Sequence, residues 1–291
     1  MIIRFEPVPV KKVWGGDKLS EIYGFSLSNI GEIWGISAHK KYSNKIINSD
    51  YKGTTFRELF KNHIELFGHY SKEEFPLLFK VIDAASDLSI QVHPNDKYAS
   101  TYEDSYGKDE CWYILSADSD SRIQIGHKAK NKNDLHSSIL NNSIEKMLKY
   151  KKIEAGDYFY IPSGKVHAIC KNTTLLEVSQ SSDITYRLYD YNRLDNGSLR
   201  PLHIDKSLNV ITIPDSDLKL QHDHRYFSFD VLHTSTEIRT ADLYGDYIYV
   251  IEGNGMINNE MIKKGDFLMV TSLSHYIFDS EFKIALIRIT S

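Results

Sequence analysis

The stretch GDYFYIPSGKVHAI (residues 156–169) has a counterpart later in the chain, GDFLMVTSLSHYIF (residues 265–278). Each begins with a Gly-Asp turn, continues as a strand-like run and reaches a His, eleven positions beyond the Gly in the first stretch and ten in the second. A strand-like run that opens with an acidic residue precedes each stretch, ECWYIL from Glu110 and DYIYVI from Asp246. The sequence therefore contains the same β unit twice.

Short strand-like runs separated by turn residues also recur along the rest of the chain. Helical spacing of apolar residues is confined to three segments, residues 54–68, 133–150 and 202–211. The repeated unit fits two related β-barrels better than one large sandwich. We therefore predict a mainly β protein with a few inserted helices, divided into residues 1–214 and 215–291 within the polar, proline-containing segment 212–220.

Composition narrows the classes of partner. Hydrophobic residues make up 41% and charged residues 25% of the 291 residues, which is ordinary for a globular protein with a real core. The formal net charge of −4 argues against nucleic acid or an anionic membrane as a partner, and no apolar run reaches the length of a membrane span. With two cysteines and no signal-peptide pattern, we expect a cytoplasmic protein without disulfides, either a monomer or a homodimer.

The segment SIQVHPND (residues 89–96) contains the first group of candidate site residues. Alternation along a strand places Ser89, Gln91 and His93 on one face and the aliphatic residues on the other. Pro94 then ends the strand, because it cannot donate to the ladder of hydrogen bonds. The strand therefore presents a hydroxyl, an amide and an imidazole together, just before a turn.

Two other segments can converge on this strand face. Glu110 opens the run ECWYIL and His167 ends the loop PSGKVH, and inward-facing residues of neighbouring strands meet in a small barrel. One Gln, two His and one Glu form a mixed set of oxygen and nitrogen ligands that suits Zn²⁺, with Fe²⁺, Mn²⁺ or Co²⁺ as alternatives. Because the second copy of the β unit has Asp246 in place of Glu110 and no Gln-x-His strand, we expect only the first copy to hold the site.

Four motifs occurring in this order, QVHPND, GKDECW, GDYFYIPSGKVHAI and SSDITYRLYDYNR, resemble the class I mannose-6-phosphate isomerases, in particular their short bacterial branch. WGG (residues 14–16) and GEIWGISAH (residues 31–39) fit as well, so the resemblance covers most of the chain and is weakest in its C-terminal part. Those enzymes are zinc-dependent cupins with two barrels, and they interconvert mannose 6-phosphate and fructose 6-phosphate. The resemblance implies a bicupin with a catalytic N-terminal cupin domain, a degenerate C-terminal cupin-like domain, one Zn²⁺ per chain and a hexose phosphate substrate.

The resemblance also implies individual site residues. The zinc ligands of the family fall on residues of the expected types, Gln91, His93, Glu110 and His167. The essential arginine of the family falls on Arg187, the acidic residue before it on Asp183, and a lysine near the glutamate ligand on Lys108. Arg193 stands where the longer relatives carry a lysine, so it keeps the charge but changes the donor geometry.

The implied reaction moves a hydrogen between C1 and C2 of an open-chain sugar through a cis-enediol(ate), whose negative charge zinc and Arg187 would stabilise. The proton-transfer base stays open at this stage. Lys108 can act only if burial beside zinc and Arg187 lowers its pKa, a zinc-bound water is a second candidate, and Asp183 can instead assist ring opening. The candidates for holding the phosphate group of the substrate are Ser89, Lys97 and Arg193.

Three other interpretations account for part of the pattern. A non-catalytic bicupin that binds a metal and a sugar is the first, but it requires no combination of Lys108, Asp183 and Arg187 beside the ligands. A metal-dependent oxygenase of the same fold would prefer a His-rich site with iron. A single-cupin glucose-6-phosphate isomerase differs by its one barrel and its ligand set.

The remaining histidines and the many tyrosines are interpreted structurally. His203, His222 and His224 have no evident set of partners, and we read them as surface or core histidines. The 19 tyrosines most simply fill the walls of the predicted barrels.

Overall fold

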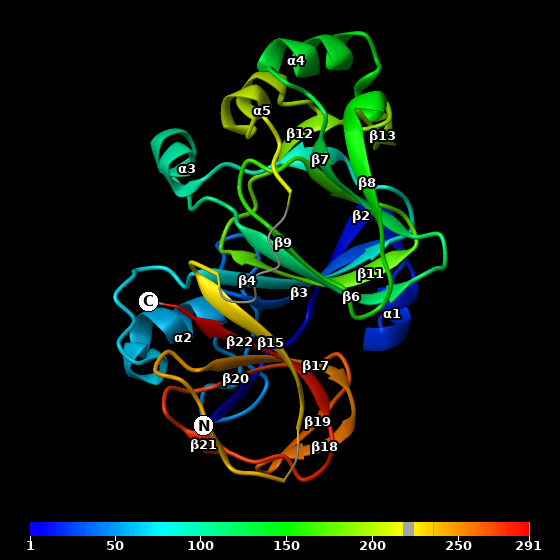
Figure 1. The fold of residues 1–291 in the computed structure, drawn as a ribbon. Coiled ribbons are helices and arrows are strands. Elements are labelled where there is room, and N and C mark those ends of the chain that lie inside the picture. Colours follow the sequence, from blue (N-terminus) through cyan, green and yellow to red (C-terminus); the bar gives the residue numbers. More distant parts are fainter. Residues whose placement is uncertain (218–223, 235, 291) are drawn as a thin grey trace. The chain divides into compact units, whose positions relative to one another are not determined.

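The computed structural model describes residues 1–217, 224–234 and 236–290, and it is mainly β (Figure 1). None of the helices in these described residues is long and apolar enough to cross a membrane. The chain forms two compact units. The middle unit comprises Val10–Glu32 and Val81–Leu220, and the terminal unit comprises Met1–Pro9, Ile33–Lys80 and Gln221–Ser291. Each unit is assembled from separate segments of the chain. The division into residues 1–214 and 215–291 and the two-barrel arrangement stay predictions.

The middle unit contains a five-stranded antiparallel sheet that carries much of the candidate site. Its order is β12-β5-β10-β7-β8, with β5 (Ile90–Val92), β7 (Arg122–His127), β8 (Leu148–Lys152), β10 (His167–Ile169) and β12 (Tyr186–Tyr189). In this order β12 is an edge strand, and β5 lies between it and β10. The two short strands β5 and β10 are neighbours in the interior of this sheet.

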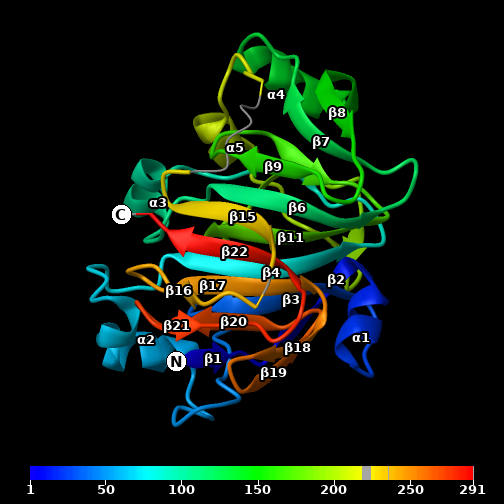
Figure 2. The same cartoon turned by 60° about the horizontal axis from the view of Figure 1, so that its bottom comes forward.

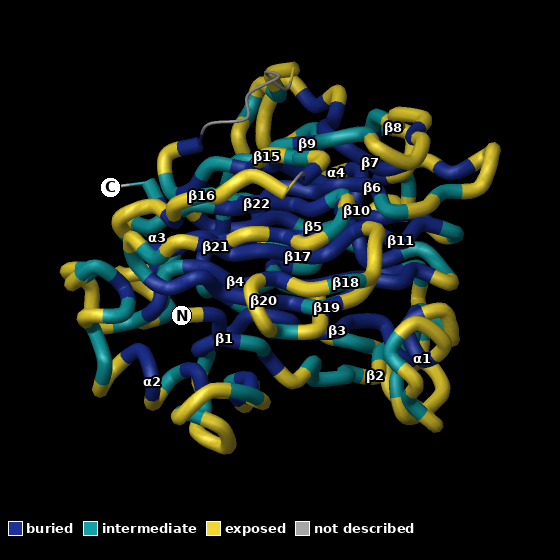
Figure 3. Tube along the Cα trace, turned by 90° about the horizontal axis from the view of Figure 1, so that it is seen from below, coloured by how far each residue is buried: buried dark blue, intermediate teal, exposed yellow. Residues whose placement is uncertain are grey.

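A second group of strands in the middle unit has β6 between β11 and β9. Their bounds are β6 (Glu110–Ala117), β9 (Tyr158–Ile161) and β11 (Thr173–Gln180), and every residue of β11 is buried. The strands β2 (Val8–Gly16), β3 (Ile30–Ser37) and β4 (Leu77–Ala84) contribute residues to both units. Apolar side chains form two buried clusters in the middle unit, one around Trp112 and Leu175 and one around Ile90, Val92 and Leu188, and the buried tube segments in Figure 3 follow these strands.

Short helices occupy the connections of the middle unit: α1 (Lys18–Tyr23), α3 (Asp96–Tyr102), α4 (Lys132–Leu140), the 3₁₀ helix η2 (Ile144–Met147) and α5 (Ile204–Val210). The helix predicted over residues 202–211 is confirmed as α5. The helix predicted over 133–150 is wrong at its end, because Asn142 adopts a positive φ of 50° and residues from Leu148 pair with β7 as strand β8. The sequence pattern missed α3, which is too short for a periodic signal and begins after the capping side chain of Asn95.

The terminal unit is built on a second five-stranded antiparallel sheet, whose neighbouring strands are visible in Figure 2. Its order is β1-β20-β17-β22-β15, with β1 (Ile2–Arg4), β15 (Phe227–His233), β17 (Asp246–Glu252), β20 (Phe267–Val270) and β22 (Lys283–Ile289). Smaller pairs are formed by β16 (Arg239–Thr240) with β21 (His275–Tyr276) and by β18 (Asn254–Ile257) with β19 (Glu260–Lys263). One buried cluster that includes Ile248, Leu268 and Leu286 forms the core of this sheet.

The helix predicted over residues 54–68 lies in the terminal unit as α2 (Phe56–Asn62) followed by the 3₁₀ helix η1 (Ile64–Phe67). Thr55 starts α2 with a capping box, because its side chain accepts from the amide of Glu58 while the Glu58 carboxylate accepts from the amide of Thr55. The apolar face that the sequence pattern indicated is buried through Phe56, Leu59 and Phe60. The predicted helix is confirmed, with one break at His63. His222 lies outside the described residues.

Candidate metal centre

The strands β5, β6 and β10 position four side chains of the predicted ligand set. Gln91 lies in β5, His93 follows this strand directly, Glu110 opens β6 and His167 opens β10. His167 stands opposite Gln91 in the antiparallel register, so the two side chains share a face of the sheet. Pro94 ends β5 immediately after His93, which leaves the imidazole at the end of the strand. The structure thus brings together residues that are up to 76 positions apart in the sequence.

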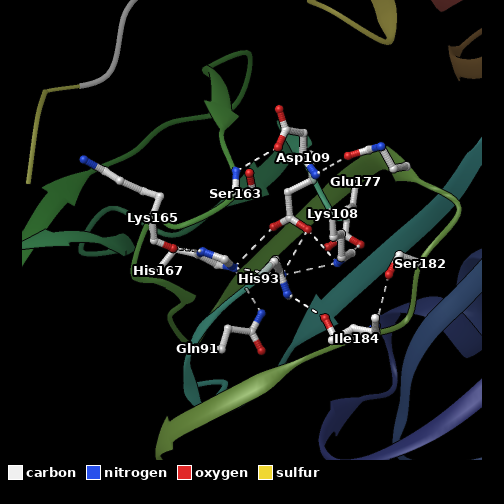
Figure 4. A network of polar contacts seen from close by, with 12 residues as sticks. Gln91, His93, Lys108, Asp109, Ser163, Lys165, His167, Glu177, Ser182 and Ile184 are labelled. Atoms are coloured by element: carbon white, nitrogen blue, oxygen red, sulfur yellow. Dashed lines mark hydrogen bonds and ion pairs between the residues drawn. The ribbon is translucent and has the colours of Figure 1, made fainter. Parts of the chain in front are cut away.

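Three of these side chains, His93, Glu110 and His167, form a compact buried group, which we call the metal group (Figure 4). Their nearest ligand atoms all lie within 4.8 Å of one another. Nε2 of His93 is 3.4 Å from Oε2 of Glu110, Nε2 of His167 is 3.4 Å from Oε1 of Glu110, and the two Nε2 atoms are 3.2 Å apart. All three residues are at most 1% exposed. A group of this kind, two imidazoles and a carboxylate, can hold a metal ion.

The hydrogen bonds of the two imidazoles determine which ring nitrogen is available. Nδ1 of His93 donates to the main-chain carbonyl of Ile184 at 2.7 Å, and Nδ1 of His167 donates to the carbonyl of Lys165 at 2.8 Å (Figure 4). With the proton on Nδ1, a neutral ring carries its lone pair on Nε2, the atom that faces Glu110. Burial, followed by the charge of Lys108, lowers the pKa of His93 to about 4, so this ring is neutral near pH 7.

Two observations test the fit of a cation to this group. Oε1 of Glu110 is buried and has no hydrogen-bond partner among the described residues, although a buried carboxylate oxygen normally has one. The Nε2 atoms of both imidazoles also lie beside this carboxylate, that of His93 next to Oε2 and that of His167 next to Oε1. A divalent cation would satisfy all three groups at once, and the donor set fits Zn²⁺ well because it combines nitrogen and carboxylate oxygen.

Gln91 can complete the set as a fourth ligand. Its side-chain amide nitrogen lies 3.3 Å from Nε2 of His167. A rotation of the amide by 180° places Oε1 in that position, and an amide carbonyl oxygen is a metal ligand, whereas the NH₂ group is not. The predicted ligand set is therefore assembled in one place, with Gln91 at its less buried side.

Lys108 lies against the same carboxylate and contacts a residue that the sequence reasoning missed. Its Nζ donates to Oε2 of Glu110 at 2.6 Å and to Oε1 of Glu177 at 3.1 Å, and it lies 3.5 Å from Nε2 of His93. Burial alone would lower the pKa of Lys108, but the two carboxylates outweigh it and the pKa is raised. The protein's own groups therefore do not supply the lowered pKa that Lys108 would need as a base, because Glu177 adds a second negative charge.

Neighbouring positive charge stabilises the ionised form of the Glu110 carboxylate. Burial on its own would raise the pKa of Glu110, but the Lys108 ammonium, followed by His93 and His167, holds this pKa well below its ordinary value. The carboxylate is therefore ionised at neutral pH and presents a negative charge to any bound cation.

Asp109 fixes the start of β6 next to the metal group (Figure 4). Its Oδ1 accepts from the amide of Ser163 at 2.9 Å, its Oδ2 accepts from the hydroxyl of Tyr160, and its own amide donates to Oε1 of Gln180 at 3.0 Å. The contacts join the turn PSGK, which precedes His167, to the strand that carries Glu110. Two ligands from different parts of the sequence are held in place through one carboxylate.

The predicted catalytic residues Arg187 and Asp183 lie on or beside β12. Arg187 stands opposite Gln91 in the register of β12 with β5, as His167 does on the other side of β5. Arg187, Gln91 and His167 therefore form a row across three neighbouring strands, with side chains on one face of the sheet. Asp183 precedes Ile184, whose carbonyl accepts from His93, so it belongs to the loop that orients a ligand. Arg187 thus shares the sheet of two predicted ligands and Asp183 stands beside the residue that binds His93, and the catalytic roles of both stay predictions.

The three candidates for phosphate binding lie in different surroundings. Ser89 is buried directly before β5, whereas Lys97 is exposed on α3. The guanidinium of Arg193 is occupied within the protein: it donates to Oδ1 of Asp190 at 3.1 Å, to the carbonyl of Asp87 at 2.6 Å and to the hydroxyl of Ser86 at 3.2 Å. The phosphate roles of all three stay predictions.

The fold and the site define a class: a mainly β protein with a buried group that can hold a metal ion, a lysine against the carboxylate and an arginine in the same row of the sheet. Comparison with known proteins then identifies the family. Residues 2–113 match the family model described as phosphomannose isomerase type I, catalytic domain.

Curated relatives and a solved structure extend this match over the chain. A mannose-6-phosphate isomerase of Bacillus subtilis is 40% identical over 91% of this chain and 91% of its own length, and one of Streptococcus mutans is 45% identical over 70% of this chain and 65% of its own length. The crystal structure of the mannose 6-phosphate isomerase from Bacillus subtilis superposes with a TM-score of 0.92 at 36% identity, covering 99% of both chains. The chain belongs to the mannose-6-phosphate isomerase family and is an isomerase.

Proposed function

We propose that this chain interconverts mannose 6-phosphate and fructose 6-phosphate, with one Zn²⁺ held by Gln91, His93, Glu110 and His167. The observation that carries the proposal is the buried group of two neutral imidazoles and an ionised carboxylate with one oxygen left without a partner among the described residues. The names of the relatives support the choice of substrate, and the donor set of the group supports the choice of metal. When bound, zinc would act as a Lewis acid toward the sugar oxygens.

The residues around the metal group have proposed roles in the isomerisation. A proton leaves C2 or C1, negative charge develops on the neighbouring oxygen of a cis-enediol(ate), and a proton returns to the other carbon. Arg187 stays protonated at all working pH values and is proposed to stabilise that negative charge. Asp183, in the loop that also carries the Ile184 carbonyl, is proposed to assist opening of the sugar ring.

Lys108 is proposed to move protons, and its contacts define how it can do so. As an ammonium it donates to Glu110 and to Glu177, and both carboxylates raise its pKa. It can therefore accept a proton from the sugar only if a bound cation offsets the charge of Glu110 and one of its own protons has passed to a carboxylate. Glu177 is the better recipient because Glu110 is also proposed to bind the metal. Glu177, which contacts Lys108, is therefore proposed as part of the proton pathway.

Substrate binding requires further groups that recognise the phosphate. Ser89, Lys97 and Arg193 are proposed for this role, with Ser89 next to the ligand strand and Lys97 free to bend from the exposed face of α3. A cytoplasmic location and a monomeric or homodimeric state complete the proposal.

The proposal is tested by turnover of mannose 6-phosphate by the purified protein, coupled to detection of fructose 6-phosphate. The measurement is made on protein as purified, after chelation, and after addition of Zn²⁺, Fe²⁺ or Mn²⁺ to separate samples. Activity that disappears with the chelator and returns best with zinc is the expected result. If folded, zinc-loaded protein gives no fructose 6-phosphate, the isomerase proposal is wrong for this substrate. The alternative is then a protein that binds a metal and a sugar without turnover.

A further inference from the structure

His203, which we interpreted from the sequence as a surface or core histidine, binds the main chain of Arg187. The amide of Arg187 donates to Nδ1 of His203 at 3.1 Å, and the amide of His203 donates to the carbonyl of Arg187 at 2.8 Å. Nη1 of Arg187 also donates to the carbonyl of Pro201 at 2.8 Å. Three hydrogen bonds therefore join Arg187 to the segment that leads into α5.

These contacts matter because β12 is an edge strand. An edge strand has β5 on one side, and its outward main-chain groups have no neighbouring strand to bind. At Arg187 both outward groups are taken by His203, one of them by the imidazole side chain. Since Arg187 is in the row that continues through Gln91 to His167, the imidazole contributes to where the guanidinium lies relative to the metal group.

The ring of His203 can accept this hydrogen bond in one form only. Nδ1 must carry a lone pair, so the neutral ring has its proton on Nε2, and a doubly protonated ring cannot accept at all. Arg187 on β12 and Lys206 on α5 disfavour the protonated ring, whereas Glu103 at the end of α3 favours it. Burial comes first among the causes that lower the pKa of His203, so the accepting form predominates near neutral pH.

We propose that His203 is a positioning residue for Arg187: its neutral imidazole accepts from the Arg187 amide and thereby sets the guanidinium for the reaction. The inference rests on the proposed function, in which Arg187 acts on the negative charge of the substrate. It predicts that the hydrogen-bond acceptor at the Nδ1 position, and not the imidazole ring as such, is what turnover requires.

Two substitutions separate the acceptor from the ring. In His203→Asn the side-chain oxygen can take the position of Nδ1, whereas in His203→Gln the amide reaches the position of Nε2 and leaves the Arg187 amide without its acceptor. Both variants keep the main-chain carbonyl of residue 203, which accepts from the amide and the hydroxyl of Ser207. The ring makes no capping hydrogen bond to α5, so neither variant removes a helix cap.

The zinc-loaded variants are compared with wild-type protein by kcat and KM for mannose 6-phosphate over a range of pH. We expect His203→Asn to stay within about threefold of wild type and His203→Gln to lose on the order of 10- to 100-fold in kcat, with KM changing less, because a small displacement of a catalytic group costs rates of that size. The acid side of the kcat profile should extend to lower pH in His203→Asn, which cannot be protonated at this position. Equal kcat values and unchanged acid limbs in the two variants would overturn the proposal.

A second measurement does not depend on the substrate. Nitrogen-15 NMR of the histidine rings in the full-length, zinc-loaded protein should show His203 protonated at Nε2 and not at Nδ1, and amide exchange at Arg187 should be slow in wild type and His203→Asn but fast in His203→Gln. A ring protonated at Nδ1 near neutral pH would overturn the inference. If these signals are as expected but wild-type protein does not turn over mannose 6-phosphate, the proposed function fails while the contact between His203 and Arg187 stands.

Discussion

Glu110 and Asp246 occupy corresponding positions in the two copies of the β unit, and their surroundings differ. Each opens a strand, β6 and β17 respectively, and each is fully buried. Around Glu110 stand two imidazoles and a lysine, and one carboxylate oxygen has no hydrogen-bond partner in the described part of the chain. Around Asp246 every contact is already made within the terminal unit.

Three groups hold Asp246. Arg288 donates to both oxygens, at 2.7 Å to Oδ1 and 3.1 Å to Oδ2, the hydroxyl of Tyr276 donates to Oδ2 at 2.7 Å, and the amide of Asp242 donates to Oδ1 at 3.1 Å. The guanidinium thus supplies the positive charge that a metal ion would supply near Glu110. His275, the counterpart of His167, is exposed and bonds to Thr240 rather than to the carboxylate.

The two copies therefore share a backbone arrangement but differ in the side chains that surround the buried carboxylate. The same turn, strand and loop can place a carboxylate inside a sheet, and the neighbouring side chains then decide the outcome. Beside Glu110, a carboxylate oxygen without a hydrogen-bond donor and two imidazole nitrogens can bind a cation. Beside Asp246, an arginine and a tyrosine already donate to the carboxylate, so no ligand atom is left for a cation. The expectation that the second copy is structural therefore has a physical basis in Arg288 and Tyr276, and four predictions test the difference.

The largest effect is expected from removal of a proposed metal ligand. His167→Ala should lower zinc content after dialysis from about one equivalent to near zero and reduce turnover of mannose 6-phosphate by roughly three orders of magnitude, the size found when a group that stabilises transition-state charge is lost. The matched control is His275→Ala in the second copy, which should keep both values at the wild-type level. Zinc retained by His167→Ala, or lost from His275→Ala, would contradict the difference between the copies.

The next prediction concerns the second copy of the β unit, in which Arg288 and Tyr276 bind the Asp246 carboxylate. Arg288→Met leaves the fully buried Asp246 carboxylate without its main counter-charge, and breaking such a pair typically costs about 3–5 kcal/mol of unfolding free energy. Arg288 is itself about a third exposed, 34%, so the lower end of that range is expected. Denaturant unfolding measures the loss, and zinc content should not change. A variant as stable as wild type would show that the Asp246 group does not stabilise the terminal unit.

The sequence predicted the ligands better than it predicted their surroundings. Gln91 and His93 could be recognised because alternation in a short strand places them on one face. Glu110 and His167 could be recognised because each stands at the end of a segment that can converge on that face. Glu177 was missed because TLLEVSQ reads as an apolar strand, and a glutamate in it is ordinarily a solvated residue. Only the pairing of β11 with β6, in which Ser179 stands opposite Glu110, shows that Glu177 faces the site.

The sequence also predicted local features of the fold better than features that depend on non-local strand pairing. Alternation and turn residues were sufficient for a mainly β protein and for helices near 54–68 and 202–211. The strand β8 was read as helix, because LKYKK has too few apolar residues for a strand signal and its pairing with β7 is non-local. His203 could not be assigned either, since its hydrogen bond to Arg187 follows from a turn that no local pattern encodes.

A pH effect of intermediate size should appear in the metal-free protein. The pKa of His93 is lowered by burial first and by Lys108 next, from 6.5 to about 4, so the unfolded chain takes up a proton in this window that the folded chain does not. Stability should therefore be unaffected by this group above pH 6.5 and should fall as pH drops toward 4, by on the order of 3 kcal/mol for a shift of this size. The control is metal-free His93→Asn, which can keep a donor for the Ile184 carbonyl but does not titrate. Parallel pH curves for the two proteins would contradict the lowered pKa.

The smallest effect is expected behind His167, where Lys165 provides the carbonyl that accepts from Nδ1. Nζ of Lys165 donates to Oδ1 of Asp215 at 2.6 Å, and both side chains are buried, so this ion pair helps to fix the carbonyl. Asp215→Asn should weaken zinc binding by about tenfold, the low end for a partner that orients a ligand, because the bond of the Thr212 amide to the Gly164 carbonyl at 2.9 Å still holds the turn.

Zinc affinity measured by competition with a chelator distinguishes this orienting role from general destabilisation. The control variant is Glu32→Gln, which breaks another ion pair of the middle unit, with Lys12 at 3.1 Å, that involves no residue of the metal group. It should leave the zinc affinity unchanged. Equal affinities in Asp215→Asn and Glu32→Gln would mean that His167 is oriented by the turn alone. The first copy of the β unit would then differ from the second only in the groups that contact the carboxylate. The Lys165–Asp215 pair would contribute to the stability of the middle unit.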